Sequence, residues 1–489
     1  MEQVDVAIIG SGFGGLAMAV NLQQAGIGPV AILEAADHVG GTWRDNTYPG
    51  AACDVTSALY SYSFHPHVWS RKYPQQAEIL EYIEEVVDAF GLRPQIRFGA
   101  RVASLTHEDA TGRWTVALAD GRTVDARVVI SSVGQLNQPA LPAVEGVGSF
   151  AGPAFHSARW DHSVDLAGRR VGIIGTGASV IQFGPQVAKV AGATTIFQRS
   201  APYVLPKPDP ETPTWKKRLY KTLPQAQLPA RAKNFALNEV FGASILGNVK
   251  LRRRITAQWR TYMESEVADP ALREVCTPDY ALGCKRALIA DDWYATVVRQ
   301  DVAVVTAEIS SIDATGVTTA DGEHHDLDVL IYGTGFRSTE FLTPMAVTGR
   351  GGLDLGDRWS EGASAYSGVA VSGFPNLFVL YGPNTNLGAN SIVYMLETQA
   401  QYITGLLEEA AHAEMASLEV LPSAEARWQA MIDAESASTA WVTGCHSWYT
   451  ADGRNTNNWP MATWKYRRAL KEPTLLDYDV RPAPAVVSA

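Results

Sequence analysis

The stretch VDVAIIGSGFGGLAMAVNLQQAG, from Val4 to Gly26, decides the fold class of this chain. Its short run of β-branched residues predicts a strand, three glycines at G-x-G-x-x-G spacing predict a tight turn, and the residues after them favour a helix. A second apolar run, PVAILEA, follows and contains an acidic residue, Glu34. Strand, glycine turn, helix, strand and acid in this order are typical of a dinucleotide-binding α/β unit.

Each glycine of this turn has a separate task. Gly10 makes the tight turn, Gly12 lets the backbone approach a pyrophosphate, and Gly15 lets the helix pack against the strand. The N-terminus of the helix attracts the phosphates, because its first N–H groups point at them. Glu34 is placed to accept hydrogen bonds from ribose hydroxyls.

The same arrangement recurs in GRRVGIIGTGASVIQFGPQVAKVAGATTIFQRSAP, residues 168–202. Strands are predicted at Val171–Ile174 and Thr194–Gln198, with Gly175 and Gly177 between them and a helix after the glycines. The third glycine position holds Val180. We therefore expect helix and strand to lie slightly further apart here than in the first copy.

The two copies differ in charge at the ribose position. Glu34 lies 24 residues after Gly10, and the residue 24 positions after Gly175 is Arg199. A carboxylate repels a 2′-phosphate, whereas a guanidinium pairs with one. The first site therefore suits a nucleotide with free ribose hydroxyls and the second suits NADPH, which suggests a flavoprotein with FAD and NADPH.

Composition limits the classes further. A composition of 46% hydrophobic and 19% charged residues is typical of a globular protein. The length of 489 residues suggests about three domains. A net charge of -11 argues against nucleic acid and anionic membranes as main partners. Apolar runs are shorter than a membrane span and no signal sequence is recognised, so we expect a cytoplasmic protein without a membrane partner. We expect a monomer or weak homodimer.

The four cysteines separate the flavoprotein classes. Cys53, Cys276, Cys284 and Cys445 include no pair at C-x-x-C spacing, so we expect scattered free thiols. A disulfide reductase needs a paired-cysteine motif, which leaves an oxidase or a monooxygenase. No metal site is predicted.

Two further motifs carry a resemblance to a known family. GGTWRDNTYPGAACDVTSALYSYSF covers residues 40–64 and FAGPAFHSARWD covers residues 150–161. Through these motifs the chain resembles the type I Baeyer–Villiger monooxygenases, a branch of the class B flavoprotein monooxygenases. Relatives that oxygenate nitrogen generally lack the Trp–Asp ending of the second motif. The residues that match are Gly41, Trp43, Tyr48, Pro49, Gly50 and Asp54 in the first, and Phe150, Gly152, His156, Ser157, Trp160 and Asp161 in the second.

The resemblance implies an NADPH- and O₂-dependent conversion of ketones to esters or lactones through a C4a-peroxyflavin. Arg286 is then catalytic: it lies over the flavin, pairs with Asp54 and stabilises the peroxide anion and the following tetrahedral oxyanion. Asp54 orients this guanidinium and compensates its charge. Lys285 joins Arg199 at the 2′-phosphate of NADPH.

The implied binding residues form two sets. For FAD they are Gly10, Gly12, Phe13, Gly15, Glu34, Gly41, Thr42, Trp43, Asp54, Tyr60, Val102, Asn384 and Leu387. For NADPH they are Gln135, Gly175, Thr176, Gly177, Ala178, Ser179, Arg199, Ser200, Lys285 and Trp448.

The predicted fold is α/β, with two Rossmann-like dinucleotide-binding domains and a helical insertion. The FAD domain takes residues 1–149 and 337–489, the NADPH domain takes 150–208 and 283–336, and the insertion takes 209–282. A helix is expected near Asn390, with its N-terminus toward the flavin. The basic cluster KLRRRIT, residues 250–256, is interpreted as a solvated helix face rather than a partner site. The linker residues Phe150, Gly152 and Trp160 anchor the first crossing between domains, and His156 is interpreted as its pivot.

Two alternatives remain open. A sulfide or amine oxygenase would use a protonated hydroperoxyflavin, and Trp160 and Asp161 weigh mildly against it. A flavin-binding redox sensor without turnover is a different class, against which an intact Asp54 and Arg286 argue.

Overall fold

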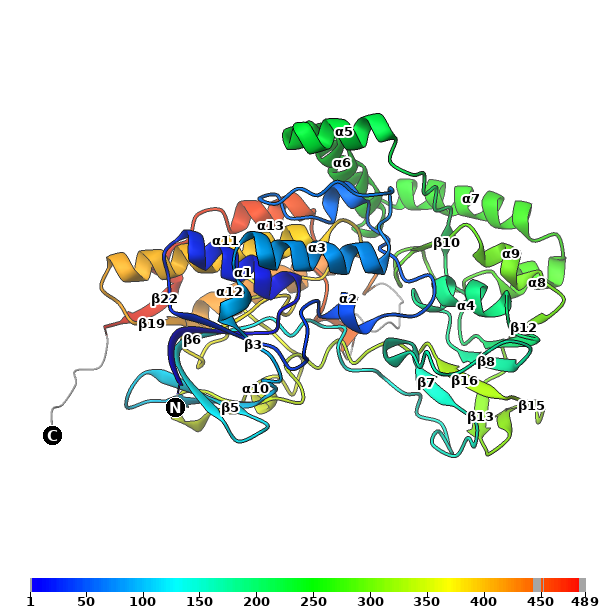
Figure 1. Ribbon diagram of the computed structural model, residues 1–489, viewed down its shortest axis with the longest axis horizontal. Coiled ribbons are helices and arrows are strands. Elements are labelled where there is room, and N and C mark those ends of the chain that lie inside the picture. The colour runs from blue at the N-terminus through cyan, green and yellow to red at the C-terminus, as the bar shows by residue number, and fades with distance from the viewer. Residues whose placement is uncertain (1, 443–449, 452, 483–489) are drawn as a thin grey trace.

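The computed structural model describes residues 2–442, 450–451 and 453–482. The molecule is elongated and contains two main sheets, one toward each end (Figure 1). Each sheet includes the strand that leads into one of the glycine turns. The expected α/β class is confirmed.

The first sheet has eight strands in the order β17-β4-β5-β6-β1-β2-β3, with β18 paired to the last part of β6 beyond the end of β5. The pairs β4–β5 and β5–β6 are antiparallel and the other pairs are parallel. The strands are β1 Glu2–Ile9, β2 Val30–Leu33, β3 Ile96–Arg97, β4 Val102–Glu108, β5 Arg113–Leu118, β6 Thr123–Ser131, β17 Ala346–Thr348 and β18 Leu377–Val379.

The second sheet has five parallel strands in the order β12-β9-β8-β16-β7. They are β7 Ala154–His156, β8 Arg170–Ile174, β9 Ala193–Phe197, β12 Val302–Val305 and β16 Val329–Tyr332. The small sheets are β13 Ile309–Ile312, β14 Gly316–Thr319 and β15 His324–Asp326, then β10 Val204–Leu205 with β11 Leu288–Ile289, β19 Ser417–Val420 with β22 Tyr478–Arg481, and β20 Thr450–Ala451 with β21 Arg454–Asn455.

Helices pack beside both sheets through their apolar side chains. On the first sheet, α1 is buried along nearly its whole length and packs against α11, whose inward face is also apolar. On the second sheet, α4 packs against α9. These helices are α1 Phe13–Gln24, α2 Thr42–Asp45, α3 Gln76–Ala89, α4 Val180–Ala188, α9 Trp293–Val297, α10 Leu355–Arg358, α11 Ile392–His412, α12 Pro422–Ser436 and α13 Thr463–Ala469.

Residues 209–282, predicted to be a helical excursion, contain four helices in the structure: α5 Thr214–Thr222, α6 Leu228–Ile245, α7 Val249–Glu266 and α8 Pro270–Val275. α5 and α6 lie at the upper edge of the molecule in Figure 1. The division into an FAD domain, an NADPH domain and an insertion, with the bounds given above, stays a prediction.

The chain crosses between the two sheets twice, and the two crossings lie side by side. Ala140 donates its N–H to the carbonyl of Gly335 at 2.9 Å, and Arg337 donates to the carbonyl of Gln138 at 2.9 Å. Pro139 and Phe336 form an antiparallel bridge between these bonds. Entry to and exit from the second sheet therefore share one narrow neck.

Candidate active site

The first glycine turn follows β1, at the carboxyl edge of the parallel strands where dinucleotides bind. Gly10 has a φ of +101°, and a Cβ there would lie 2.7 Å from the carbonyl oxygen of Ser132. A Cβ on Gly15 would lie 2.0 Å from the carbonyl oxygen of Gly10. Gly12 has open space, its nearest neighbour being the Cα of Gly41 at 3.7 Å. The close packing at Gly15 and the open floor at Gly12 match the tasks predicted for them.

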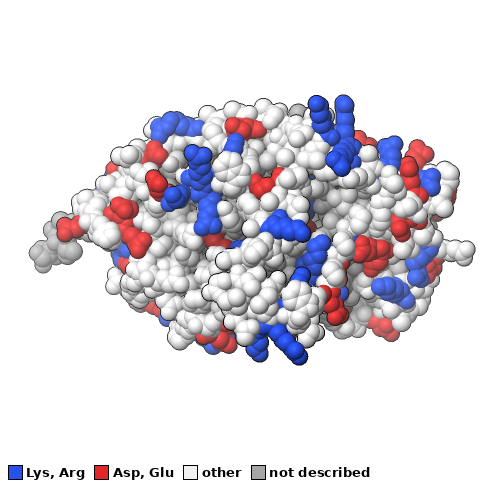
Figure 2. Space-filling model, turned by 90° about the horizontal axis from the view of Figure 1, so that it is seen from above, with Lys and Arg blue, Asp and Glu red and all other residues white. Residues whose placement is uncertain are grey.

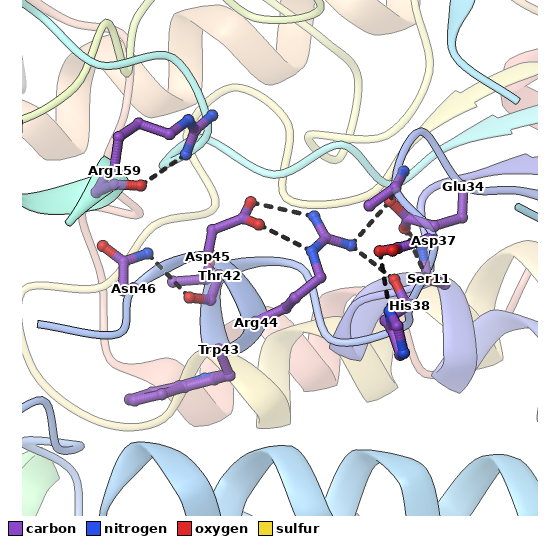
Figure 3. Close-up of polar contacts among 12 residues, drawn as sticks. Ser11, Glu34, Asp37, His38, Thr42, Trp43, Arg44, Asp45, Asn46 and Arg159 are labelled. Atoms are coloured by element: carbon purple, nitrogen blue, oxygen red, sulfur yellow. Dashed lines mark hydrogen bonds and ion pairs between the residues drawn. The ribbon is translucent and has the colours of Figure 1, made fainter. Parts of the chain in front are cut away.

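Glu34 directly follows β2, lies beside this turn (Figure 3) and is almost fully buried. It accepts hydrogen bonds from the backbone N–H of Ser11 at 3.0 Å and from its hydroxyl at 2.6 Å. It also accepts from the N–H of Ala36 and from Arg44, each at 2.9 Å. Burial raises the pKa of Glu34, but these bonds outweigh it and leave the pKa lowered. The acid at the ribose position is therefore an ionised, fixed acceptor.

The second glycine turn follows β8. Gly175 has a φ of +110°, and a Cβ there would lie 2.5 Å from the carbonyl oxygen of Gly333. Val180, at the third glycine position, is fully buried. A Cβ on Gly333 would lie 2.1 Å from a methyl carbon of Val180. The missing side chain at position 333 thus makes the room that the third glycine provides in the first copy.

Beyond the second turn, basic groups gather where Arg199 was predicted to meet a phosphate. Lys285 donates from Nζ to the hydroxyl of Ser200 at 2.6 Å, and its ammonium lies 4.6 Å from the ring centre of Tyr280. Burial, and after it the neighbouring Arg199, lowers the pKa of Lys285. Thr176 donates to the carbonyl of Ser200 at 3.0 Å. The cluster is an electropositive pocket suited to a phosphate.

Asp54 and Arg286, 232 positions apart, form a two-pronged ion pair. Nε of Arg286 donates to one carboxylate oxygen of Asp54 and an Nη donates to the other, each at 2.8 Å. Both side chains are partly exposed and line the same cavity. Bidentate geometry fixes the plane of the guanidinium, and the carboxylate compensates its charge.

Aromatic and amide side chains line the same space near the first turn. The indole of Trp43 donates to the hydroxyl of Tyr60 at 2.9 Å, with the rings edge to face. Gln135 donates from Nε2 to the carbonyl of Tyr381 at 2.9 Å. Within the part of the chain that the structure describes, the buried Oε1 of Gln135 has no hydrogen-bond partner. An orphaned acceptor in a cavity wall is a position where a ligand donor fits.

One connected cavity of about 2230 Å³ joins the two turns. Gly15 and Asn384 are not among its lining residues; Asn384 is buried and donates to the carbonyl of Asn455 at 2.7 Å. Trp448 lies outside the described residues. The predicted residues that do line the cavity are Gly10, Gly12, Phe13, Glu34, Gly41, Thr42, Trp43, Asp54, Tyr60, Val102, Gln135, Gly175, Thr176, Gly177, Ala178, Ser179, Arg199, Ser200, Lys285, Arg286 and Leu387.

The linker motif lies beside the neck, and its Arg159 lines the cavity. His156 ends β7, accepts at Nδ1 from the N–H of Ala158 at 3.1 Å, and packs edge to face on Phe336 of the return crossing at 5.7 Å. Burial lowers the pKa of His156, and the backbone of Gly335 partly opposes this. His156 thus contacts the return crossing through Phe336, and its role as a pivot stays a prediction.

The other linker residues are held by packing. Trp160 lies between Phe155 and Phe183, with ring centres 5.2 Å from each. A Cβ on Gly152 would lie 2.7 Å from the carbonyl oxygen of Asp328 and 2.8 Å from the ring of Phe150. The motif therefore needs glycine at position 152 for close approach, beside a Phe150 that packs with the core next to the second sheet.

Comparison with known proteins shows the family to which the chain belongs. The family model described as "Pyridine nucleotide-disulphide oxidoreductase" matches residues 7–235. A curated relative from Streptomyces coelicolor, named Baeyer-Villiger monooxygenase, is 39% identical over 100% of this chain and 95% of its own length. The chain belongs to the Baeyer–Villiger monooxygenases. The resemblance read from the two motifs is confirmed.

Solved structures agree with this membership. This Baeyer–Villiger monooxygenase is similar to an oxidised steroid monooxygenase bound to NADP, with a TM-score of 0.88 and 32% identity over 98% of this chain and 100% of the other. A closed crystal structure of cyclohexanone monooxygenase gives a TM-score of 0.90 and 28% identity over 99% and 100%. Among the described residues, no helix of this family member is long and apolar enough to cross a membrane.

Sequence reasoning missed two residues at the centre of this Baeyer–Villiger monooxygenase, Gln182 and Gly333. Gln182 contacts the loop that carries Asp54, and Gly333 lies under Val180. The available signal for Gln182 was a polar amide within the apolar stretch VIQFG, residues 180–184. One expectation is wrong: Cys53 and Cys276 are free, but Cys284 is disulfide-bonded.

Proposed function

We propose that this chain is an FAD-containing, NADPH- and O₂-dependent monooxygenase that converts ketones to esters or lactones. The observation that carries the proposal is the Asp54–Arg286 pair in the wall of a cavity that joins two dinucleotide turns. Membership in the Baeyer–Villiger family and the similarity to a steroid monooxygenase bound to NADP support it.

The residues present fit both cofactors. The open floor at Gly12 admits a pyrophosphate, the fixed carboxylate of Glu34 accepts from ribose hydroxyls, and the orphaned Oε1 of Gln135 offers an acceptor in the cavity. The pocket formed by Arg199, Ser200 and Lys285 supplies the positive charge that a 2′-phosphate requires. When bound, NADPH supplies hydride and the flavin supplies the reaction with O₂.

The protein contributes orientation and charge. Arg286, fixed by Asp54, presents guanidinium donors that stabilise negative charge as it develops on the substrate carbonyl oxygen. Asp54 keeps the guanidinium from leaving this position and offsets its charge in a partly buried site. No side chain needs to form a covalent bond to the substrate.

The test is a panel of aromatic, cyclic, linear and steroid ketones with NADPH and O₂, in which ester or lactone is quantified separately from H₂O₂. We expect oxygenated product from at least one class, with NADPH consumed in proportion. Peroxide without ester across the whole panel contradicts the proposal, and sulfoxide from thioethers without ester from ketones favours the heteroatom oxygenase instead.

A further inference from the structure

The helical insertion concentrates positive charge in an acidic chain. Residues 214–266, from the start of α5 to the end of α7, contain eleven Lys and Arg and three acidic residues, Glu239, Glu264 and Glu266, a net charge of +8. The whole chain has a net charge of -11. The whole-chain charge therefore describes the remainder of the molecule and conceals a strongly basic surface here.

Much of this charge faces outward and lacks a partner. Seven of the eleven basic side chains are exposed, and within the described residues none of the seven forms an ion pair with a carboxylate. They are Arg218, Lys221, Lys233, Lys250, Arg253, Arg254 and Arg260. The cluster at 250–256 is thus part of a larger surface rather than a solitary helix face.

Exposed apolar side chains occupy the same helices. Trp215 of α5 is 63% exposed and Leu219, one turn further on, is 39% exposed, so both lie on one outward face. Seven of the fourteen large apolar side chains exposed among the described residues fall between residues 215 and 249: Trp215, Leu219, Leu223, Leu228, Leu237, Val240 and Val249. Solvated helices normally place polar residues at such positions.

The inward side of α6, by contrast, is firmly attached. Arg231 donates to the carbonyl of Ser61 at 2.8 Å and pairs with the buried Glu397 at 3.3 Å. Glu239 accepts from Asn390 at 2.8 Å and from the N–H of Thr463 at 3.0 Å. Glu239 and Arg231 take part in this attachment, so the outward apolar and basic side chains form a fixed surface. Seen from above, charged side chains of both signs lie around a broad area without Lys, Arg, Asp or Glu (Figure 2).

We propose that the exposed side chains of α5, α6 and α7, here called the insertion surface, bind an anionic lipid bilayer. Apolar side chains flanked by Lys and Arg on a helix are what an interfacial helix uses: the former enter the acyl boundary and the latter contact acidic headgroups. Charge complementarity selects an anionic surface, and seven exposed apolar residues favour lipid over nucleic acid, which has no apolar layer to receive them. The expectation of no membrane partner rested on the whole-chain charge and on the lack of a membrane-spanning segment or signal sequence, and neither describes the charge of this one surface.

The test measures sedimentation of the complete holoprotein with vesicles of phosphatidylglycerol and phosphatidylcholine in equal parts, and with pure phosphatidylcholine vesicles. We expect binding to the anionic vesicles only, weakened by added salt. Arg253→Gln with Arg254→Gln should weaken binding roughly 30-fold, since each basic residue near an anionic surface contributes about fivefold. Trp215→Ser with Leu219→Ser should weaken it on the order of tenfold or more.

Matched controls lie elsewhere on the surface. Arg93→Gln with Arg122→Gln removes the same charge, and Leu476→Ser removes an exposed apolar side chain; both should leave vesicle binding unchanged. Flavin content and unfolding temperature verify that every variant is folded. Equal affinity for neutral and anionic vesicles, or an equal loss in the controls, overturns the proposal. Binding of duplex DNA that is unchanged by the Trp215 and Leu219 substitutions also overturns it. So does a dimer that dissociates on these substitutions, if no variant binds vesicles.

Discussion

The side-chain amide of Gln182, on α4, forms two hydrogen bonds with the backbone of Ala52. Nε2 donates to the Ala52 carbonyl at 3.0 Å, and Oε1 accepts from the Ala52 N–H at 3.3 Å. Oε1 also accepts from the hydroxyl of Tyr48 at 3.0 Å. Because Ala52 lies two residues before Asp54, the helix after the second glycine turn directly holds the loop that presents the Asp54–Arg286 pair.

Gln182→Ala should therefore loosen Asp54 without emptying either cofactor site. We expect flavin binding to persist and the share of NADPH that ends as H₂O₂ instead of ester to rise several-fold, because partly buried polar backbone loses its partner. Gln186→Ala is the matched control, since Gln186 lies one turn further along α4 and bonds Asp292 instead. An equal rise in both variants removes the positioning role from Gln182.

Arg286→Ala should bind FAD and accept hydride, yet lose ester formation by about 10²–10³-fold, the usual effect of removing one preorganised oxyanion donor. Stopped-flow reduction of the flavin and ester yield separate the two steps. Arg127→Ala breaks a similar bidentate pair with Asp5 outside the cavity and serves as control. Normal ester yield from the Arg286 variant contradicts the role assigned here.

Lys285 makes NADPH binding dependent on pH. Its pKa is lowered by burial and by Arg199, so the ammonium loses its proton at a pH below that of an ordinary lysine. A 2′-phosphate binds the charged form, so KM for NADPH should rise as pH increases toward 10 while KM for NADH changes little. Arg199→Ala should narrow the preference for NADPH over NADH, and an unchanged ratio argues against this phosphate pocket.

The contact between Val180 and Gly333 predicts a compensating pair of substitutions. Gly333→Ala places a methyl 2.1 Å from the Val180 side chain and should destabilise the second nucleotide site by about 1–3 kcal/mol through overpacking. Adding Val180→Ala should restore NADPH binding, because it removes the methyl groups that clash. Titration of NADP⁺ by calorimetry compares the single and double variants; failure of the double variant to recover indicates a different defect.

His156 tests the pivot interpretation. His156→Ala removes the contact with Phe336 and should slow flavin reduction and lower coupling, while oxygen transfer in a single turnover of pre-reduced enzyme stays near normal. A double-mutant cycle with Phe336→Ala should show non-additive effects, since the two rings touch. Loss confined to the oxygen-transfer step assigns His156 to the chemistry instead.

The local parts of this fold were predictable because their signals are local. The glycine spacing after Val4–Ile9 and after Val171–Ile174 placed both turns, and the helix expected near Asn390 begins at Ile392. Contacts between distant segments were not predictable: Gln182 and Ala52 are 130 positions apart, and neither residue type signals the other. The need for glycine at position 333 likewise follows only from the pairing of β16 with β8, which brings Gly333 beside Val180. The roles of Asp54 and Arg286 came from family resemblance, whereas their pairing geometry required the structure.

The neck at Pro139 and Phe336 has a topological consequence. Because the chain leaves the first sheet and returns to it across adjacent hydrogen bonds, residues 141–334 form a closed excursion whose ends nearly meet. A segment whose ends adjoin leaves the sheet that hosts it continuous, so this excursion is an insertion in the topology of the first sheet. It is nevertheless not detachable, because Arg231 and Arg286 within it pair with Glu397 and Asp54 of the host part.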